Sequence, residues 1–250
     1  MVEVKDLSLT YGQAKETAIL ALAGLNAGFE TGAFSVIVGP SGCGKTSLIK
    51  IMAGLLKPSA GTVSVKGKNT ALIFQDYGLL PWKTVRGNAE LPLRFCNTGR
   101  KERRERADAL FAKFGLKGFE KAYPRELSGG MKQRLAIIRA LLMEPQLLLM
   151  DEPFSSLDTF TREEAQDFFL SIKKELELTI VMVSHSIEEA VYLADTVYIM
   201  ASKNPGTIKC HIHISRNGES HSDFRETPKF YEYCSSLRQL LKNPAGEAQA

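Results

Sequence analysis

One eight-residue segment has the glycine spacing of a loop that binds phosphate groups. It fits the pattern Gly-x-x-x-x-Gly-Lys-Ser/Thr and reads Gly39-Pro40-Ser41-Gly42-Cys43-Gly44-Lys45-Thr46. Glycines let backbone N–H groups turn inward around phosphates, and the N-terminus of a following helix favours an anion. Lys45 is expected to reach the β- and γ-phosphates of a nucleotide, and Thr46 to offer its hydroxyl to Mg²⁺. The alternative, a glycine turn that only caps a helix, explains less of the pattern.

Two adjacent acids follow an apolar stretch and carry the groups needed to hydrolyse a nucleotide. Residues 147–150 have the unalternating pattern of a strand buried on both faces, and Asp151 and Glu152 come directly after them. Ligands of open α/β sheets collect at the carboxyl ends of strands. Asp151 is therefore predicted to hold Mg²⁺, and Glu152 to orient and deprotonate the attacking water. Acid pairs are common on surfaces, so this interpretation depends on the Lys45 loop upstream.

A third segment narrows the class of ATPase. It reads Leu127-Ser128-Gly129-Gly130-Met131-Lys132-Gln133 and lies shortly before Asp151. Alone, it could be a helix entry with Ser128 as the N-cap. It also resembles the LSGGQ signature of ABC ATPases, with Met131 and Gln133 in a variant order frequent among importers. The resemblance implies that Ser128, Gly129 and Gly130 contact the γ-phosphate of ATP held by another subunit, in a head-to-tail dimer with two shared sites.

Further residues resemble landmarks of the same family, in the expected order along the chain. Gln75 resembles the glutamine that touches Mg²⁺ or water, and Asp158 ends a segment that resembles the D-loop, Ser155-Ser156-Leu157-Asp158. His185 resembles the switch histidine at the γ-phosphate, and Tyr11 the aromatic that stacks on adenine. Taken singly, each also has a structural explanation, as a loop residue, a helix-start histidine or a core tyrosine.

The motifs fall within an alternation of strands and helices. Apolar alternation predicts a strand at 2–9, and apolar runs predict further strands at 34–38, 62–65, 72–74, 147–150 and 179–183. Helices are expected at 45–53, 100–114, 131–143, 161–176, from 187 onward and at 230–241. This β-then-α rhythm favours an α/β sheet with helices on both sides.

The resemblance to ABC ATPases implies a more specific fold. It is an α/β P-loop NTPase with a RecA-like parallel core, an N-terminal antiparallel β portion and an inserted helical subdomain. We expect an ATPase domain over residues 1–215, with the insert at about 76–128, and a tail with an amphipathic helix over 216–250. The chain departs from the family in a short connector between Val65 and Ala71. Ser47, which we also assign to the nucleotide site, stands where a second threonine is common.

Composition is ordinary for a globular protein, with 32 Lys and Arg against 28 Asp and Glu. The resulting formal charge of +4 is too small for a dedicated nucleic-acid binder and suits work near an anionic membrane face. No apolar run approaches the roughly 18–20 residues needed to cross a bilayer, and the N-terminus has no signal-peptide pattern. If the protein acts at a membrane, we expect it to be peripheral, on the cytoplasmic face, held by a partner.

The cysteines and two of the histidines carry no pattern of their own. The cysteines are scattered without ligand spacing and are interpreted as reduced thiols: Cys43, Cys96, Cys210 and Cys234. Cys43 is interpreted as a small filler of the phosphate loop, with the added hypothesis that its alkylation blocks ATP binding. His211 and His213 match nothing in the family and are interpreted as ordinary strand residues.

One stretch of the insert indicates the kind of transport. Residues 79–88 resemble the ATPases of nitrate, sulfonate and taurine-type importers and read Leu79-Leu80-Pro81-Trp82-Lys83-Thr84-Val85-Arg86-Gly87-Asn88. The resemblance implies partnership with integral membrane permease subunits, and indirectly with a solute-binding protein, by a homodimer or a pair of related ATPase subunits. Trp82 has a second interpretation, as an anchor of the insert's own small core.

Two other classes of function fit the sequence less well. A soluble ABC-type ATPase acting on nucleic acid or ribosomes usually has two cassettes, a long coiled coil or zinc-binding inserts, none of which is evident in the sequence. The mixed charges of residues 100–106 favour a solvated helix face over a nucleic-acid patch. A regulatory subunit with an inactive site is disfavoured because Lys45, Asp151, Glu152 and His185 are all present.

Overall fold

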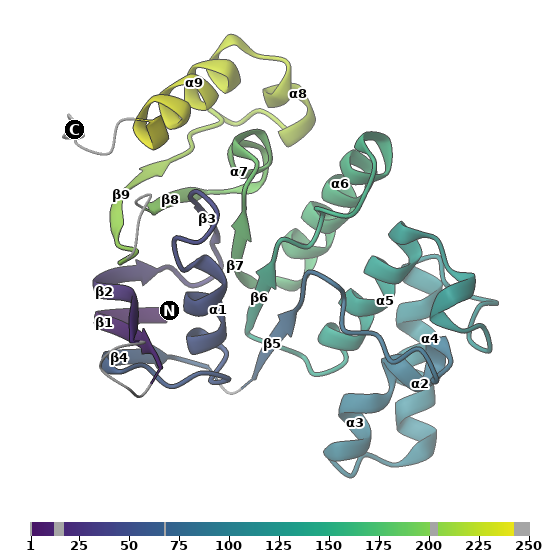
Figure 1. Cartoon of the computed structure of the whole chain (residues 1–250). Coiled ribbons are helices and arrows are strands. Elements are labelled where there is room, and N and C mark those ends of the chain that lie inside the picture. Colours follow the sequence, from purple (N-terminus) through teal and green to yellow (C-terminus); the bar gives the residue numbers. More distant parts are fainter. Residues whose placement is uncertain (1, 13–17, 68, 201–204, 243–250) are drawn as a thin grey trace. The chain divides into compact units, whose positions relative to one another are not determined.

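The structure, a computed structural model, describes residues 2–12, 18–67, 69–200 and 205–242. The chain divides into two compact units (Figure 1). The first unit combines Met1–Gly67 with Leu170–Ala250, and the second is Lys68–Phe169. The predicted insert, 76–128, lies within the second unit, and the last eight residues of the predicted tail lie outside the described residues.

The first unit contains a three-stranded antiparallel sheet in the order β2-β1-β4. Its strands are β1 (Val2–Tyr11), β2 (Ile19–Phe29) and β4 (Ala60–Val65). The alternating apolar residues of β1 are buried, which confirms the strand predicted at 2–9. No sequence pattern indicated β2, which contains two glycines, one of them at a positive φ, and pairs with β1 through several register shifts.

The same unit also contains a mainly parallel group of strands in the order β7-β3-β8-β9. In it, β3 (Phe34–Val38) lies between β7 (Thr179–Ser184) and β8 (Thr196–Met200), parallel to both, and β9 (Ile208–His213) runs antiparallel to β8. Every residue of β3, β7 and β8 is buried. Continuous burial explains the unalternating apolar runs and confirms the strands predicted at 34–38 and 179–183.

Four helices belong entirely to the first unit. They are α1 (Lys45–Met52), α7 (Ile187–Leu193), α8 (His221–Arg225) and α9 (Pro228–Lys242). Helices α1 and α7 pack against the parallel strands, and α9 packs on α7 (Figure 1). The predicted helices at 45–53, from 187 and at 230–241 are confirmed. Helix α6 (Thr159–Leu176) contains the boundary between the two units.

The second unit is mainly helical around two parallel strands, β5 (Thr70–Ile73) and β6 (Leu147–Asp151). Its helices are α2 (Val85–Ala89), α3 (Leu91–Phe95), α4 (Arg100–Lys113) and α5 (Gly129–Leu141), with a 3-10 turn at Pro124–Glu126. Helix α5 packs against β5, α2 and α4. The helix predicted at 131–143 begins two residues earlier, since Ser128 caps it.

The charged stretch that begins α4 makes ion pairs within its own unit. Arg106 pairs with Glu102 and Glu144, and Lys101 pairs with Glu105. These pairs agree with the interpretation of a solvated helix face. Among the described residues, no helix is long and apolar enough to span a membrane.

Candidate functional site

The phosphate-binding loop lies in the first unit, between the end of β3 and the start of α1. Gly42 and Gly44 have φ angles of 80° and 95°, in the left-handed region that favours glycine. Gly44 is also the N-cap of α1. The glycine spacing of the motif thus follows from the backbone turn, which directs the chain from a buried strand into a helix.

Close packing restricts the same loop from its inner side. A Cβ on Gly39 would lie 2.8 Å from Cys43 Sγ, and a Cβ on Gly44 would lie 2.5 Å from Leu22 Cδ2. Cys43 is 1% exposed, so its side chain fills the space below the loop. At Gly39 and Gly44 the packing therefore leaves no room for a side chain.

Gly206 supports the loop from a distant part of the sequence, although it belongs to none of the motifs predicted for the nucleotide site. Its N–H donates to Ala21 O at 2.8 Å, and its own carbonyl accepts from Ala23 N at 3.2 Å. A Cβ on Gly206 would overlap the carbonyl oxygen of Cys43. The Pro205-Gly206 pair is a recognisable turn signal, but its target depends on the tertiary fold.

Lys45 holds its ammonium group over the loop. The side chain is buried, and Nζ donates to Gly39 O at 2.6 Å and to Pro40 O at 3.0 Å. Both acceptors belong to the loop itself. The ammonium is therefore already positioned where the motif predicts phosphate, with the loop carbonyls as its hydrogen-bond partners.

The other predicted nucleotide residues of this unit lie near the ends of strands and the start of α1. The hydroxyls of Tyr11 and Ser47 form a hydrogen bond at 2.9 Å, which brings the exposed ring of Tyr11 to the first turn of α1. Thr46 and His185 are also exposed. His185 lies between β7 and α7, whose N-cap Ser186 accepts from Glu189 N at 3.1 Å.

The predicted hydrolytic residues lie in the second unit. Asp151 is buried at the end of β6, and Glu152 follows with a φ of 49°, an uncommon value for a residue with a side chain. Gln75, in the turn after β5, donates through Nε2 to Glu152 Oε2 at 3.4 Å. The structure thus brings the Gln75 amide and the Glu152 carboxylate together in a long hydrogen bond.

The signature segment forms the exposed start of α5. Ser128 Oγ accepts from Met131 N at 3.3 Å, which confirms Ser128 as the N-cap. Ser128 and Gly129 are exposed, whereas Gly130 is buried and a Cβ there would lie 3.1 Å from Thr161 Cγ2. The N-terminus of α5 is therefore exposed at the surface of its unit, where the partial positive charge of a helix N-terminus favours binding of an anion.

Asp158 lies just before α6 and has a structural role. Its carboxylate accepts from Thr161 N at 3.1 Å, at the start of α6. Hydrogen bonds from Thr161 lower the pKa of Asp158 below its usual value, so the carboxylate is ionised at neutral pH. The hydrogen bond to Thr161 is a sufficient structural reason for an acid at position 158. The predicted role of Asp158 at the nucleotide of a partner subunit stays a proposal.

Comparison with known proteins places this arrangement in a family. Residues 22–155 match the family model described as ABC transporter. The chain is 39% identical to the nitrate import ATP-binding protein NrtD of Synechocystis sp., over 96% of this chain and 95% of that protein. It is 45% identical to the aliphatic sulfonates import ATP-binding protein SsuB of Bacillus licheniformis, over 75% and 74%.

A solved structure supports the same conclusion. The ATP-binding cassette MJ0796, described as a dimer in a post-hydrolysis state bound to ADP and Pi, matches with a TM-score of 0.75 and 30% identity. The match covers 86% of this chain and 99% of that one. The chain belongs to the ABC transporter family. It is an ABC-type ATPase that binds ATP, with the P-loop fold predicted from its motifs.

The exposure of two side chains of the ABC ATPase, Cys43 and Trp82, bears on what was expected of them. Burial raises the pKa of the Cys43 thiol, so the thiolate that reacts with alkylating agents is scarce as well as inaccessible. Cys43 is therefore expected to react slowly in the folded protein, and the hypothesis that its alkylation blocks ATP binding stays a prediction. Trp82 is 71% exposed, so its interpretation as a buried anchor of the insert was wrong.

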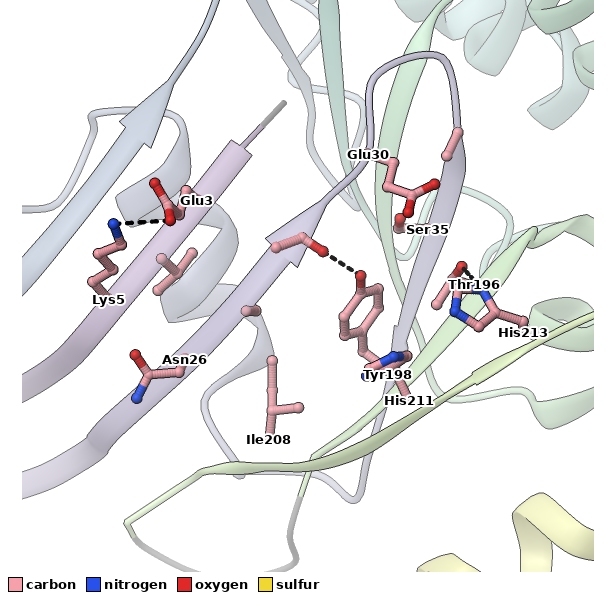
Figure 2. A pocket seen from close by; sticks show the side chains of 14 residues that line it. Glu3, Lys5, Asn26, Glu30, Ser35, Thr196, Tyr198, Ile208, His211 and His213 are labelled. Atoms are coloured by element: carbon pink, nitrogen blue, oxygen red, sulfur yellow. Dashed lines mark hydrogen bonds and ion pairs between the residues drawn. The ribbon is translucent and has the colours of Figure 1, made fainter. Parts of the chain in front are cut away.

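The first unit of the ABC ATPase also contains a cavity of about 460 Å³ (Figure 2). It lies between β1 and β2 of one sheet and β3, β8 and β9 of the other. His211 and His213 lie on β9, as predicted for strand residues, and His213 Nδ1 bonds Thr196 Oγ1 at 3.0 Å. The residues that line this cavity include none of those predicted for the ATP site.

Proposed function

We propose that this ATPase is a subunit of an ABC importer and couples ATP-driven closure of a dimer to solute uptake through a separate permease. The observation that carries the proposal is the sequence similarity to import ATP-binding proteins. Both relatives described above are import ATP-binding proteins, and one of them is matched over 95% of its length. Residues 79–88, similar to that group in sequence, fit the same proposal.

The first unit would supply the binding half of the chemistry. The backbone of residues 39–46 would surround the phosphates, and Lys45 would leave its carbonyl partners to contact the β- and γ-phosphates. Tyr11 would stack on the adenine, Ser47 would lie beside it, and His185 would contact the γ-phosphate. The buried, prepositioned ammonium of Lys45 supports these assignments.

The second unit would supply hydrolysis. Glu152 would accept the proton of the attacking water, and Gln75, whose amide already contacts the Glu152 carboxylate, would orient that water. Thr46, Gln75 and Asp151 carry hard oxygen donors that suit Mg²⁺. The bound ion would neutralise charge on the phosphates as the γ-phosphoryl group leaves.

We further propose that two copies, or this chain and a related ATPase subunit, share two nucleotide sites. Ser128, Gly129, Gly130 and Asp158 would then meet the ATP bound by the partner. The exposed N-terminus of α5 supports this assignment, since its unpaired N–H groups suit a phosphate brought by another surface. The dimeric description of MJ0796 is consistent with it.

The partner at the membrane would be an integral permease, contacted by the predicted insert. Trp82 and Phe95, both within the second unit, are 71% and 80% exposed and would be available for such a contact. This docking would place the ATPase peripherally on the cytoplasmic face of the membrane. A solute-binding protein would take part indirectly, through the permease.

The transported solute would be a small inorganic or organic anion such as nitrate, a sulfonate or taurine. Support comes from the names of the relatives and from residues 79–88. Specificity itself would lie in the permease and the binding protein, because the residues assigned here bind nucleotide.

The proposal is tested by purifying the tagged ATPase from gently solubilised native membranes and identifying its companions by mass spectrometry. A polytopic permease, with or without a solute-binding protein, is the expected companion. Loss of that companion in a Trp82→Ala variant, with an exposed tyrosine changed in Tyr231→Ala as the matched control, would locate the contact. Recovery of ribosomes or nucleic-acid-binding proteins without a permease would overturn the importer proposal and leave the ATPase activity in place.

A further inference from the structure

The turn that carries Gln75 contains a tyrosine in an unfavourable backbone conformation. Tyr77 has a φ of 62°, in the left-handed region that residues with side chains seldom adopt. Its N–H donates to Phe74 O at 2.9 Å, which closes the turn two residues after Gln75. The Tyr77 side chain is only 6% exposed. A strained residue with a buried side chain needs contacts from its surroundings to stay in place.

Arg139 of α5 supplies contacts to the backbone of the turn. Its guanidinium donates to Gly78 O at 2.6 Å and also to Tyr77 O. Helix α5 is the helix that begins at Ser128. The charged guanidinium of Arg139 therefore holds the carbonyl groups of Tyr77 and Gly78 in place from helix α5.

The phenol of Tyr77 reaches the segment that follows Glu152. Tyr77 Oη and Ser156 Oγ form a hydrogen bond at 2.8 Å. Burial raises the pKa of the Tyr77 phenol above its usual value, so the hydroxyl stays protonated throughout the neutral range and keeps this bond.

The segment around Ser156 is itself tied to Glu152. Ser155 Oγ donates to Glu152 O at 2.9 Å, and Gln133 of α5 donates to Pro153 O at 3.1 Å. The turn after β5 and the turn after β6 thus touch at two points, Gln75 with Glu152 and Tyr77 with Ser156. The hydrogen bond between Gln75 and Glu152 is long, at 3.4 Å, whereas the one between Tyr77 and Ser156 is short, at 2.8 Å.

We propose that Tyr77 is a positioning residue for ATP hydrolysis, and that its hydrogen bond to Ser156 fixes the spacing between the Gln75 amide and the Glu152 carboxylate. The proposal rests on the proposed function, in which these two groups prepare the attacking water. The short, part-buried bond between Tyr77 and Ser156 holds the two turns, so that the weaker contact at Gln75 can open to admit water without the turns separating.

The test compares Tyr77→Phe, Ser156→Ala and the double variant of the full chain, assayed for kcat and for the KM of MgATP. Removing the hydrogen bond is expected to lower kcat about three- to tenfold, the effect of one intramolecular hydrogen bond, with little change in KM. The double variant should be no slower than either single variant, because the same bond is lost in all three. Ser156→Thr, which retains the hydroxyl, should restore kcat.

Two reference variants distinguish the role proposed for Tyr77 from the role proposed for Glu152. Glu152→Gln is expected to bind ATP but to lose about a hundredfold or more in turnover. Tyr231→Phe, which removes an exposed tyrosine hydroxyl from α9, should keep normal activity. Normal turnover by Glu152→Gln would overturn the role of Glu152 itself.

Three outcomes would overturn the role of Tyr77 while the role of Glu152 stands. They are an unchanged kcat in both single variants, losses that multiply in the double variant, and a lowered melting temperature with normal kcat for the folded protein. The last would mean that the hydrogen bond only stabilises the second unit.

Discussion

Two glycine-rich segments of this chain each lead into a helix, but their surroundings differ. The segment at 39–46 precedes α1 and is packed on its inner side by Leu22, Cys43 and Gly206, with the Lys45 ammonium bound to its carbonyls. The segment at 128–130 precedes α5, and its first two residues are exposed. A Cβ on Gly129 or Gly130 would each meet a side-chain carbon, Leu157 Cδ2 at 3.2 Å and Thr161 Cγ2 at 3.1 Å.

The difference indicates what each segment requires to act. Around residues 39–46, the loop conformation and the lysine position are already determined within one unit, which is the condition for binding an anion without reorganisation. At residues 128–130 the helix N-terminus is formed, but nothing in its own unit covers Ser128. We infer that the first segment is complete within the chain and that the second acts together with another surface.

The largest expected effect comes from disabling each segment separately and then mixing the variants. Lys45→Ala and Ser128→Arg should each lower ATPase activity at least about a hundredfold, the first with loss of ATP binding and the second without it. A 1:1 mixture should recover about one quarter of wild-type activity, because about half of the dimers are mixed and each of these keeps one intact site. Steady-state ATPase assays and nucleotide titrations provide the measurements.

The mixture also shows whether the sites are shared. Two copies of the same variant leave every site defective, so either variant alone is the control. An inactive mixture in which mixed dimers form would show that the two segments do not complete one another across subunits.

A second prediction compares the tolerance of the two segments to a methyl group. Gly44→Ala combines a left-handed φ with an overlap on Leu22, so the free energy of unfolding should fall by about 2–4 kcal/mol. Gly129→Ala meets only the flexible end of Leu157, at 3.2 Å, and should change that free energy by less than about 1 kcal/mol. Urea denaturation measures both. Similar losses would contradict the contrast in packing.

A third prediction concerns the remote support of the phosphate loop. A methyl group at Gly206 would displace the Cys43 carbonyl, so Gly206→Ala should weaken ATP binding about tenfold even though residue 206 lies outside the nucleotide-site motifs. Gly99→Ala is the matched control, because a Cβ there meets open space. Calorimetric titration with ATP gives the comparison. Unchanged affinity in Gly206→Ala would mean that the loop holds its shape without this support.

The smallest effect is expected from thiol modification of the native protein. Cys96 is exposed and should react first with iodoacetamide, whereas Cys43 and Cys234 are buried. Burial also raises the pKa of Cys234 to about 11, so very little thiolate forms at pH 8. Peptide mass spectrometry should find both buried thiols unmodified while ATP binding is unchanged. Rapid labelling of Cys43 in the folded protein would contradict the packing beneath the loop.

Local patterns in the sequence determined much of the fold and the identity of the motifs. Buried parallel strands were recognisable from unbroken apolar runs, and Ser128 was recognisable as a helix cap from its residue type and the pattern after it. The phosphate loop was recognisable because its glycines and lysine act within eight consecutive residues. In each case the relevant interactions join residues close in sequence, so residue type and spacing alone carry the information.

Contacts between residues far apart in sequence were decided only by the tertiary structure. Gly206 supports the Cys43 carbonyl, and Tyr77 reaches Ser156 across 79 positions. The burial of Cys43 and the exposure of Trp82 also depend on which elements pack together. Such contacts follow from strand register and helix packing, which bring separate segments within a few ångströms of each other. A sequence pattern confined to one segment cannot encode them.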